Sequence, residues 1–110
     1  MKFKNDKYKS IRGGRSKLLN ISCRKCDEHV LYYQKDGAGN LRRMYMDRIV
    51  GPNKLSKNQY KNIKDVNPLI CVGCKEVLAH PIIYKKEKRN AYRCFVDGIN
   101  KKQIKKTDLT

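Results

Sequence analysis

The fold of this 110-residue chain is decided by two short stretches, Cys23-Arg24-Lys25-Cys26 and Cys71-Val72-Gly73-Cys74. In each stretch a two-residue spacer separates the cysteines, so both sulfur atoms of a tight turn can face the same point. The 44 residues between the stretches leave room for a hairpin and a loop. We name the turns the first knuckle (residues 23–26) and the second knuckle (residues 71–74), and we expect them to meet in space.

The two cysteine pairs together predict a metal site. Structural zinc is held in a tetrahedron by four ligands, and four thiolates are one of its common ligand sets. Gly73 suits a knuckle, since one position of such a turn often needs positive φ. Disulfides or an iron–sulfur cluster remain as alternatives. We predict one Zn²⁺ per chain, with the ligands Cys23, Cys26, Cys71 and Cys74.

The remaining cysteine and the histidines are not expected to bind the metal. Cys94 falls in an apolar stretch, residues 92–96, and is predicted to be a small buried side chain. His29 and His80 each follow a knuckle closely, and we expect them beside the site or at the surface. Five cysteines and two histidines are too few for two separate four-ligand sites.

The sequence contains no signal for export or for membrane insertion. Residues 1–7 lack the apolar segment of a secretory signal, and no apolar run approaches the roughly 20 residues that a spanning helix needs. We therefore expect a reducing, cytoplasmic location, where cysteines bind metal more often than they form disulfides. Neither a membrane nor a small-molecule substrate is expected as a partner.

The chain carries a formal net charge of +17, with 19 Lys against 3 Glu. Codon usage in an AT-rich genome favours both residue types, so it does not explain this imbalance. Four thiolates and one Zn²⁺ would change the total by −4 and +2, which leaves +15. A field of this sign attracts polyanions, above all nucleic-acid phosphates. It also suits an acidic protein partner.

Local patterns predict a mainly β chain. Residues 18–22 and 30–35 have strand composition, and residues 36–40 supply the Gly and Asn that hairpin turns need. Residues 41–50 are expected to return as the second strand of that hairpin, with a bulge or short helix where the apolar residues fail to alternate. A mostly polar loop follows, and then a second hairpin formed by residues 82–86 and 91–96.

The ends of the chain differ from its middle. Residues 1–22 hold seven Lys or Arg against one Asp, and residues 99–110 hold four Lys against one Asp. Each half of the middle would be a knuckle followed by a hairpin, and whether the halves form a true internal repeat stays open. We predict a basic flexible arm (residues 1–17), a folded domain (residues 18–98) and a basic tail (residues 99–110).

The knuckles and the hairpins after them resemble the zinc-ribbon superfamily, which is found in transcription factors, RNA polymerase subunits and ribosomal proteins. The resemblance rests on the four cysteines and covers residues 18–98. It implies a small mainly-β zinc ribbon, with two knuckle-plus-hairpin halves around one four-cysteine site. It points to a type of fold rather than to one function.

A weaker resemblance in layout connects the chain with nucleases of the HNH type. That family has an Asp-His-Ile-like strand between its two cysteine pairs, and this chain has Asp47-Arg48-Ile49 at a similar spacing. Arg48 stands in place of the family's general-base histidine, and a guanidinium that stays protonated cannot take a proton from water. The segment after Cys74 is predicted as a strand, where the family has a metal-binding helix. We therefore expect no enzyme, and a degenerate nuclease is the minor alternative.

These observations predict a non-catalytic zinc-binding module that binds RNA, with ribosomal RNA or the ribosome as the first candidate. The alternative is a protein-interaction zinc ribbon, such as a transcription or ribosome accessory factor. Phosphate contacts would position the module without reading the bases. Strand tyrosines are expected in the core more often than stacked on bases. The predicted phosphate contacts are Arg12, Arg15, Lys17, Arg24, Lys25, Arg42, Arg43, Lys85, Lys86, Arg89, Lys101 and Lys102.

Overall fold

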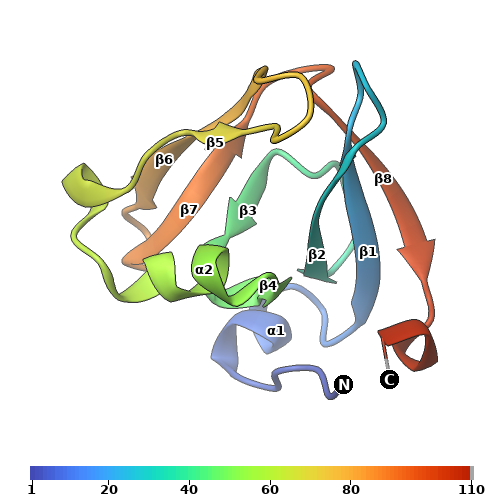
Figure 1. The fold of residues 1–110 in the computed structure, drawn as a ribbon. Coiled ribbons are helices and arrows are strands. Elements are labelled where there is room, and N and C mark those ends of the chain that lie inside the picture. Colours follow the sequence, from blue (N-terminus) through green and yellow to red (C-terminus); the bar gives the residue numbers. More distant parts are fainter. Residues whose placement is uncertain (110) are drawn as a thin grey trace.

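Two four-stranded antiparallel sheets make up the computed structural model, which describes residues 1–109 (Figure 1). Sheet A contains β1 Ser16–Cys23, β2 His29–Asp36, β4 Ile49–Gly51 and β8 Ile99–Ile104, in the spatial order β4-β2-β1-β8. Sheet B contains β3 Arg43–Tyr45, β5 Leu69–Ile70, β6 Val77–Tyr84 and β7 Arg89–Cys94, in the order β3-β7-β6-β5. The prediction of a mainly-β domain is confirmed.

The helices are short and lie between or beside the sheets. They are α1 Lys7–Ile11, α2 Asn53–Ser56 and four 3₁₀ turns, Met46–Arg48, Lys57–Tyr60, Ile63–Asp65 and Lys106–Leu109. Asp6 begins α1, because its carboxylate accepts the backbone N–H groups of Tyr8 and Lys9. Within residues 1–109 no helix has the length and apolar character that crossing a membrane requires.

Each knuckle is the turn of a hairpin. β1 and β2 flank the first knuckle and pair with Ile21 opposite Leu31, next to a bulge at the knuckle end. β5 and β6 flank the second knuckle and pair with Leu69 opposite Ala79. The two knuckles therefore enter the structure as the tips of two hairpins from different sheets.

The predicted hairpin across residues 36–40 is wrong. Only β4 returns to β2, with Ile49 opposite Tyr33, while β3 crosses to sheet B and places Met44 opposite Tyr92. The 3₁₀ turn at Met46–Arg48 separates β3 from β4, and the N–H of Tyr45 donates to the hydroxyl of Tyr33 rather than to a β2 carbonyl. Residues 43–51 therefore supply one strand to each sheet, β3 to sheet B and β4 to sheet A.

The predicted hairpin after the second knuckle is confirmed. β6 and β7 pair directly, with Ile82 opposite Ala91 and Tyr84 opposite Arg89, around the turn at residues 85–88. Among residues 1–109, a hairpin of consecutive strands follows the second knuckle but not the first. The layout expected from the zinc-ribbon resemblance is therefore not reproduced in the first half.

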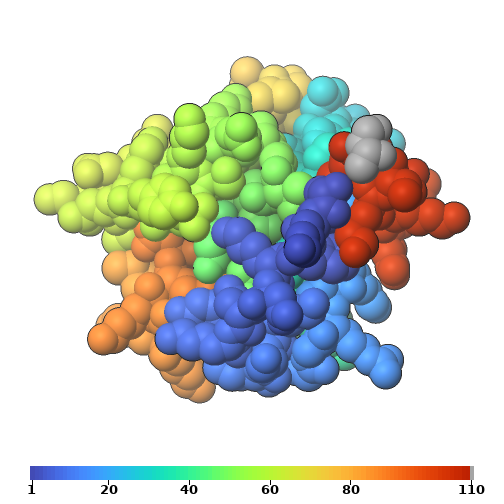
Figure 2. All heavy atoms as spheres, turned by 90° about the horizontal axis from the view of Figure 1, so that it is seen from below, coloured from blue at the N-terminus to red at the C-terminus, as the bar shows by residue number. Residues whose placement is uncertain are grey.

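Both basic ends contribute to regular structure. Ile99–Ile104, expected in the tail, forms β8 and pairs with β1, where Lys101 lies opposite Ile21. At the other end the N–H of Lys4 donates to Gln34, and Phe3 lies under the ammonium group of Lys106. Figure 2, which views the molecule from below, shows the N-terminal residues, in blue, beside the C-terminal residues in red. Within the part of the chain that the structure describes, residues 99–104 thus form an edge strand of sheet A, and residues 3–12 contact the folded domain.

The apolar core lies between the two sheets. Ile21 and Leu31 contribute from sheet A, Leu78 and Tyr92 contribute from sheet B, and each is at most 1% exposed. The full buried cluster comprises Leu19, Ile21, Cys23, Leu31, Tyr33, Met44, Met46, Ile49, Val66, Leu69, Cys71, Leu78, Ala79 and Tyr92. Since Cys23 and Cys71 belong to this cluster, the core extends up to the knuckles.

Candidate metal centre

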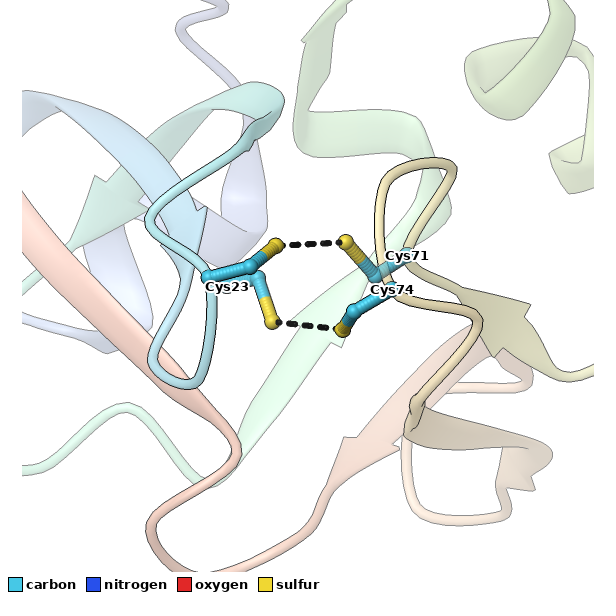
Figure 3. A group of neighbouring side chains, drawn as sticks. Cys23, Cys71 and Cys74 are labelled. Carbon is cyan, nitrogen blue, oxygen red and sulfur yellow. Dashed lines mark hydrogen bonds between the residues drawn. The ribbon is translucent and has the colours of Figure 1, made fainter.

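The four predicted ligands come together where the two hairpins meet (Figure 3). Their sulfur atoms all lie within 4.8 Å of one another. Cys23 ends β1 and Cys26 lies in the turn to β2, whereas Cys71 follows β5 and Cys74 lies in the turn to β6. The prediction that the two knuckles meet in space is confirmed, and each sheet supplies one of them.

The backbones of the two knuckles follow the same course. In each, the N–H of the first cysteine donates to the carbonyl five residues later: Cys23 to Glu28 at 2.8 Å, and Cys71 to Glu76 at 2.9 Å. The residue after the second cysteine has a φ of 65° or 66° and donates its N–H to the carbonyl of the first cysteine. These residues are Asp27 and Lys75. The repeated geometry turns both cysteine side chains of each knuckle toward the other knuckle.

The spacing of the sulfur atoms fits a tetrahedral metal ion. Cys23 Sγ lies 3.7 Å from Cys74 Sγ, and Cys26 Sγ lies 3.4 Å from Cys71 Sγ. A zinc ion with Zn–S bonds of about 2.3 Å holds its sulfur ligands about 3.8 Å apart. All five cysteines are free, so none of these thiols is used in a disulfide. The four side chains therefore form a cage of the right size for one metal ion, with a set of donors that zinc and iron–sulfur centres both use.

Backbone amides of the knuckles point at the sulfur atoms. The N–H of Cys74 is the strongest influence on Cys71, and together with the N–H of Gly73 it lowers the pKa of that thiol to about 7, although burial acts in the opposite direction. N–H groups of Glu28 and Glu76 donate to the sulfur atoms of the second cysteines and act to lower their pKa, but desolvation and hydrogen bonds with the neighbouring thiols outweigh them, so that the pKa of Cys26 is raised to about 12 and that of Cys74 is also raised. Donors of this kind stabilise thiolates, which are the form of cysteine that binds metal.

Gly73 has a different role from the predicted one. It does not have a positive φ; the positive values belong to the residues that follow the second cysteines. A Cβ at Gly73 would lie 3.3 Å from Cys26 Sγ and 3.4 Å from the Cβ of Glu28. The close approach of the first knuckle therefore leaves little room for a side chain at this position, whereas the backbone conformation would allow one.

The other cysteine and the histidines lie outside the cluster. His29 donates a hydrogen bond of 2.6 Å from Nδ1 to Asn20 Oδ1, and the rings of His80 and Phe95 pack nearly at a right angle. Cys94 is half-buried in β7, and burial raises the pKa of its thiol to about 12. A thiol with so high a pKa is inert at neutral pH.

Comparison with known proteins gives no match to the chain among family models, curated proteins or solved structures. The structure shows a small mainly-β domain with four clustered cysteines. The zinc-ribbon and HNH resemblances rest on sequence patterns, and no family model or relative supports either.

Arg48, which takes the place of the HNH histidine, is a buried structural residue. Its side chain is 1% exposed and forms ion pairs with Asp6 at 2.5 Å and with Asp36 at 2.8 Å. The hydrogen bond from Arg48 is the main cause that lowers the pKa of Asp6 to about 2. The chain after Cys74 forms β6, as predicted, and not a helix. Sequence reasoning missed this ion-pair cluster, because nothing local connects residues 6, 36 and 48.

Two of the arginines predicted to contact phosphate form ion pairs within the protein instead. Arg89 is buried and pairs with Asp47 at 2.6 Å and with Glu87 at 2.8 Å, while its guanidinium covers the ring of Tyr45 at 3.8 Å. Arg12 pairs with Glu87 at 3.0 Å and donates to the Tyr45 hydroxyl at 2.7 Å. These two arginines hold the N-terminal segment against sheet B, so we leave both out of the candidate contact surface.

The other predicted contacts are more accessible. Arg24 pairs with Asp97 and Lys25 with Glu76, in both cases between exposed side chains. Arg43 is half-buried and stacks over the ring of Tyr84 at 4.2 Å. The exposed members of the predicted set without a salt bridge among the described residues are Arg15, Lys17, Arg42, Lys85, Lys86, Lys101 and Lys102.

The tyrosines follow the expectation that most belong to the core. Tyr33, Tyr45 and Tyr92 are buried, and Tyr92 accepts a hydrogen bond from Asn58 through its hydroxyl. Tyr32 and Tyr84 are half-buried. Of these five, only the last two retain ring surface for a ligand.

Proposed function

We propose that the chain is a non-catalytic zinc-binding module whose positive surface binds RNA, with ribosomal RNA as the first candidate. The observation that carries the proposal is an imbalance between the charges used inside the fold and those left at its surface. Salt bridges among the described residues involve six of the ten Asp and Glu but only five of the 27 Lys and Arg. The fold thus neutralises most of its acidic groups and leaves most basic ones for a polyanion.

The metal would have a structural part. Its four ligands come from two hairpins in different sheets, so one Zn²⁺ bound to all of them would cross-link sheet A to sheet B. Four thiolates fill the tetrahedron and leave no open position for a substrate, as in structural rather than catalytic zinc sites. In a domain with so small a core, metal binding would contribute directly to the free energy of folding.

The proposed contact surface consists of the accessible members of the predicted set. They come from the start of β1 and the residue before it, the first knuckle, β3 and the loop before it, the β6–β7 turn and β8. Long cationic side chains in these places would lie on phosphates and position the module without reading bases. The proposed contacts are Arg15, Lys17, Arg24, Lys25, Arg42, Arg43, Lys85, Lys86, Lys101 and Lys102.

A protein-interaction module is the second candidate, and one observation favours it. Val72 is 63% exposed at the tip of the second knuckle, and Val96 is 90% exposed in the loop after β7. Apolar side chains exposed at loop tips are available to a protein partner, and a partner that covers them would remove that apolar surface from water. An acidic partner would suit the net charge.

Sedimentation of the tagged protein through a density gradient of host lysate tests the proposed function. We expect co-migration with ribosomal subunits at low salt and release at high salt, because phosphate contacts give a steep loss of affinity with salt. Migration at the top of the gradient in both salts would contradict the ribosomal assignment. Co-migration that survives high salt would favour an apolar protein interface instead.

Variants at the β6–β7 turn test the phosphate contacts individually. Changing Lys85 and Lys86 to Ala should reduce the slope of log affinity against log salt by about 0.7 to 0.9 for each contact that is lost. The matched control is Lys64→Ala, an exposed lysine outside the proposed surface. An unchanged slope in the double variant would remove this turn from the RNA contact.

A further inference from the structure

A groove of about 770 Å³ is lined by residues of β3, β6, β7 and β8 and of the loops beside them. The loop that joins β7 to β8 lies where these two strands begin to run apart (Figure 1). The volume of the groove falls within the range of pockets that hold a small ligand or a nucleotide. We call it the basic groove and define it by six of its lining residues: Arg42, Arg43, Tyr84, Arg93, Phe95 and Lys101. None of these six is a metal ligand, and Arg93 and Phe95 were not singled out from the sequence.

The cations of the basic groove are not neutralised by the fold. Arg43 on β3 lies directly opposite Arg93 on β7, and two like charges at such a cross-strand position destabilise a sheet. The salt bridges of the described residues include neither arginine. Lys101 adds a further positive charge from sheet A. An unneutralised arginine pair of this kind is stabilised when an anion binds between its members.

One carboxylate lines the basic groove, and it already has a partner. Asp97 accepts a hydrogen bond of 2.9 Å from Arg24 of the first knuckle. The negative charge of Asp97 is therefore balanced by Arg24, which does not line the groove. The potential inside the groove stays positive.

Aromatic and apolar side chains make up the rest of the wall. The ring of Tyr84 carries the guanidinium of Arg43 at 4.2 Å, which holds that cation over the groove. Phe95 packs at nearly a right angle to the ring of His80, with centroids 4.8 Å apart, and is 42% exposed, so part of its ring surface remains available for stacking. Cations interleaved with open aromatic faces are typical of surfaces that bind single-stranded nucleic acid.

We propose that the basic groove binds a single-stranded segment of RNA, with one unpaired base stacked on Phe95 and the neighbouring phosphates on Arg43 and Arg93. The inference rests on the proposed RNA-binding function and adds the place and the form of the ligand. A duplex offers phosphates to a positive surface but keeps its base faces stacked inside, so it would leave Phe95 unused.

The rim of the groove is tied to the metal centre. The N–H of Arg24 in the first knuckle donates to the carbonyl of Gly98 at 3.1 Å, and the N–H of Phe95 donates to the carbonyl of Leu78 at 3.0 Å. These bonds fix the loop at residues 95–98 between the first knuckle and β6. The position of Phe95 therefore depends on the knuckle that the metal orders.

Fluorescence anisotropy with two labelled probes tests the inference, using the zinc-loaded full chain. The probes are a 12-nucleotide oligouridine and a 12-base-pair RNA duplex. We expect Phe95→Ala to weaken binding of the oligouridine at least 5-fold, the lower end of the effect of losing one stacked base, with little change for the duplex. Phe95→Tyr should restore binding. Arg93→Glu should weaken oligouridine binding about 10-fold or more, well beyond the charge-matched control Lys64→Glu.

The outcomes separate the groove from the wider function. If RNA binds but Phe95→Ala and Arg93→Glu behave like the control, the basic groove is not the site, while the proposed RNA binding stands. If neither probe binds at low salt, the proposed function fails and the groove assignment fails with it. Unchanged zinc content and near-UV circular dichroism in each variant establish that the fold is intact.

Discussion

Asp27 and Lys75 occupy equivalent positions in the two knuckles, with φ values of 65° and 66° and the same backbone hydrogen bond to the first cysteine. The two residues have opposite charges and no side-chain feature in common. Their shared conformation is imposed by the turn, which must reverse the chain after the second sulfur ligand. Left-handed backbone at non-glycine residues carries an energetic cost, so these positions hold strain that metal binding would have to offset.

Lys75→Val should therefore destabilise the zinc-loaded protein by about 1 kcal/mol, because a β-branched residue fits the left-handed region poorly. Lys75→Asn is the matched control, since it also removes the charge but tolerates this conformation. Urea unfolding of both variants measures the difference. Equal midpoints would show that the conformation at this position is not under strain.

Gly73→Ala should lower the affinity for zinc about 5-fold or more, since forced overpacking costs about 1 kcal/mol or more. The added Cβ would press on Cys26 Sγ and on Glu28, and the φ of Gly73 itself adds no backbone strain. Competition with a chromophoric chelator measures the affinity. Gly51→Ala is the control, because a Cβ at Gly51 meets no atom within 4 Å. Equal affinities of the two variants would contradict the close approach of the knuckles.

Arg48→Met should destabilise the fold by about 3 kcal/mol, because it leaves Asp36 buried without its cation. The same change at Arg42, which is exposed, should cost less than about 0.5 kcal/mol. Denaturant unfolding at neutral pH compares the two. A loss below about 1 kcal/mol at Arg48 would mean that the ion-pair cluster with Asp6 and Asp36 contributes little to the attachment of the N-terminal segment.

Removal of zinc by a chelator should abolish binding of the oligouridine probe, and added Zn²⁺ should restore it. The reason is the backbone link from Arg24 to Gly98, which connects the first knuckle to the loop that carries Phe95. Anisotropy before chelation, after chelation and after zinc addition measures the effect. Undiminished binding in the metal-free protein would contradict the coupling between the metal centre and the basic groove.

The sequence was sufficient to predict the cysteine cluster and the β6–β7 hairpin, since both depend on local patterns. A two-residue spacer determines how one knuckle is built, and residues 85–88 connect two stretches of strand composition. The first hairpin was predicted wrongly, although its Gly-rich turn is a good local signal. The strand Arg43–Tyr45 leaves this hairpin for sheet B, where Met44 reaches the core by pairing with Tyr92, 48 positions further along the chain.

The strand at Ile99–Ile104 was not predicted for a related reason. β8 contains Asn100, Lys101, Lys102 and Gln103 in succession, a polar run without the alternation that marks a half-buried strand. An edge strand needs only one neighbour, and charged side chains are favoured there because they discourage association with other sheets. The order of the N-terminal segment depends on Arg48 and Glu87, which no local pattern connects with residues 1–17.

The zinc content of the purified chain and of its cysteine variants, measured by native mass spectrometry, tests the central claim most directly. The account predicts one Zn²⁺ per chain in the unchanged protein and in Cys94→Ser. Cys23→Ser and Cys74→Ser should each lose the metal and, with it, the near-UV circular dichroism of the folded domain, because metal binding is coupled to folding. A metal-free chain that keeps a native near-UV spectrum, or a Cys74→Ser variant that still holds one Zn²⁺ with full affinity, would contradict the account.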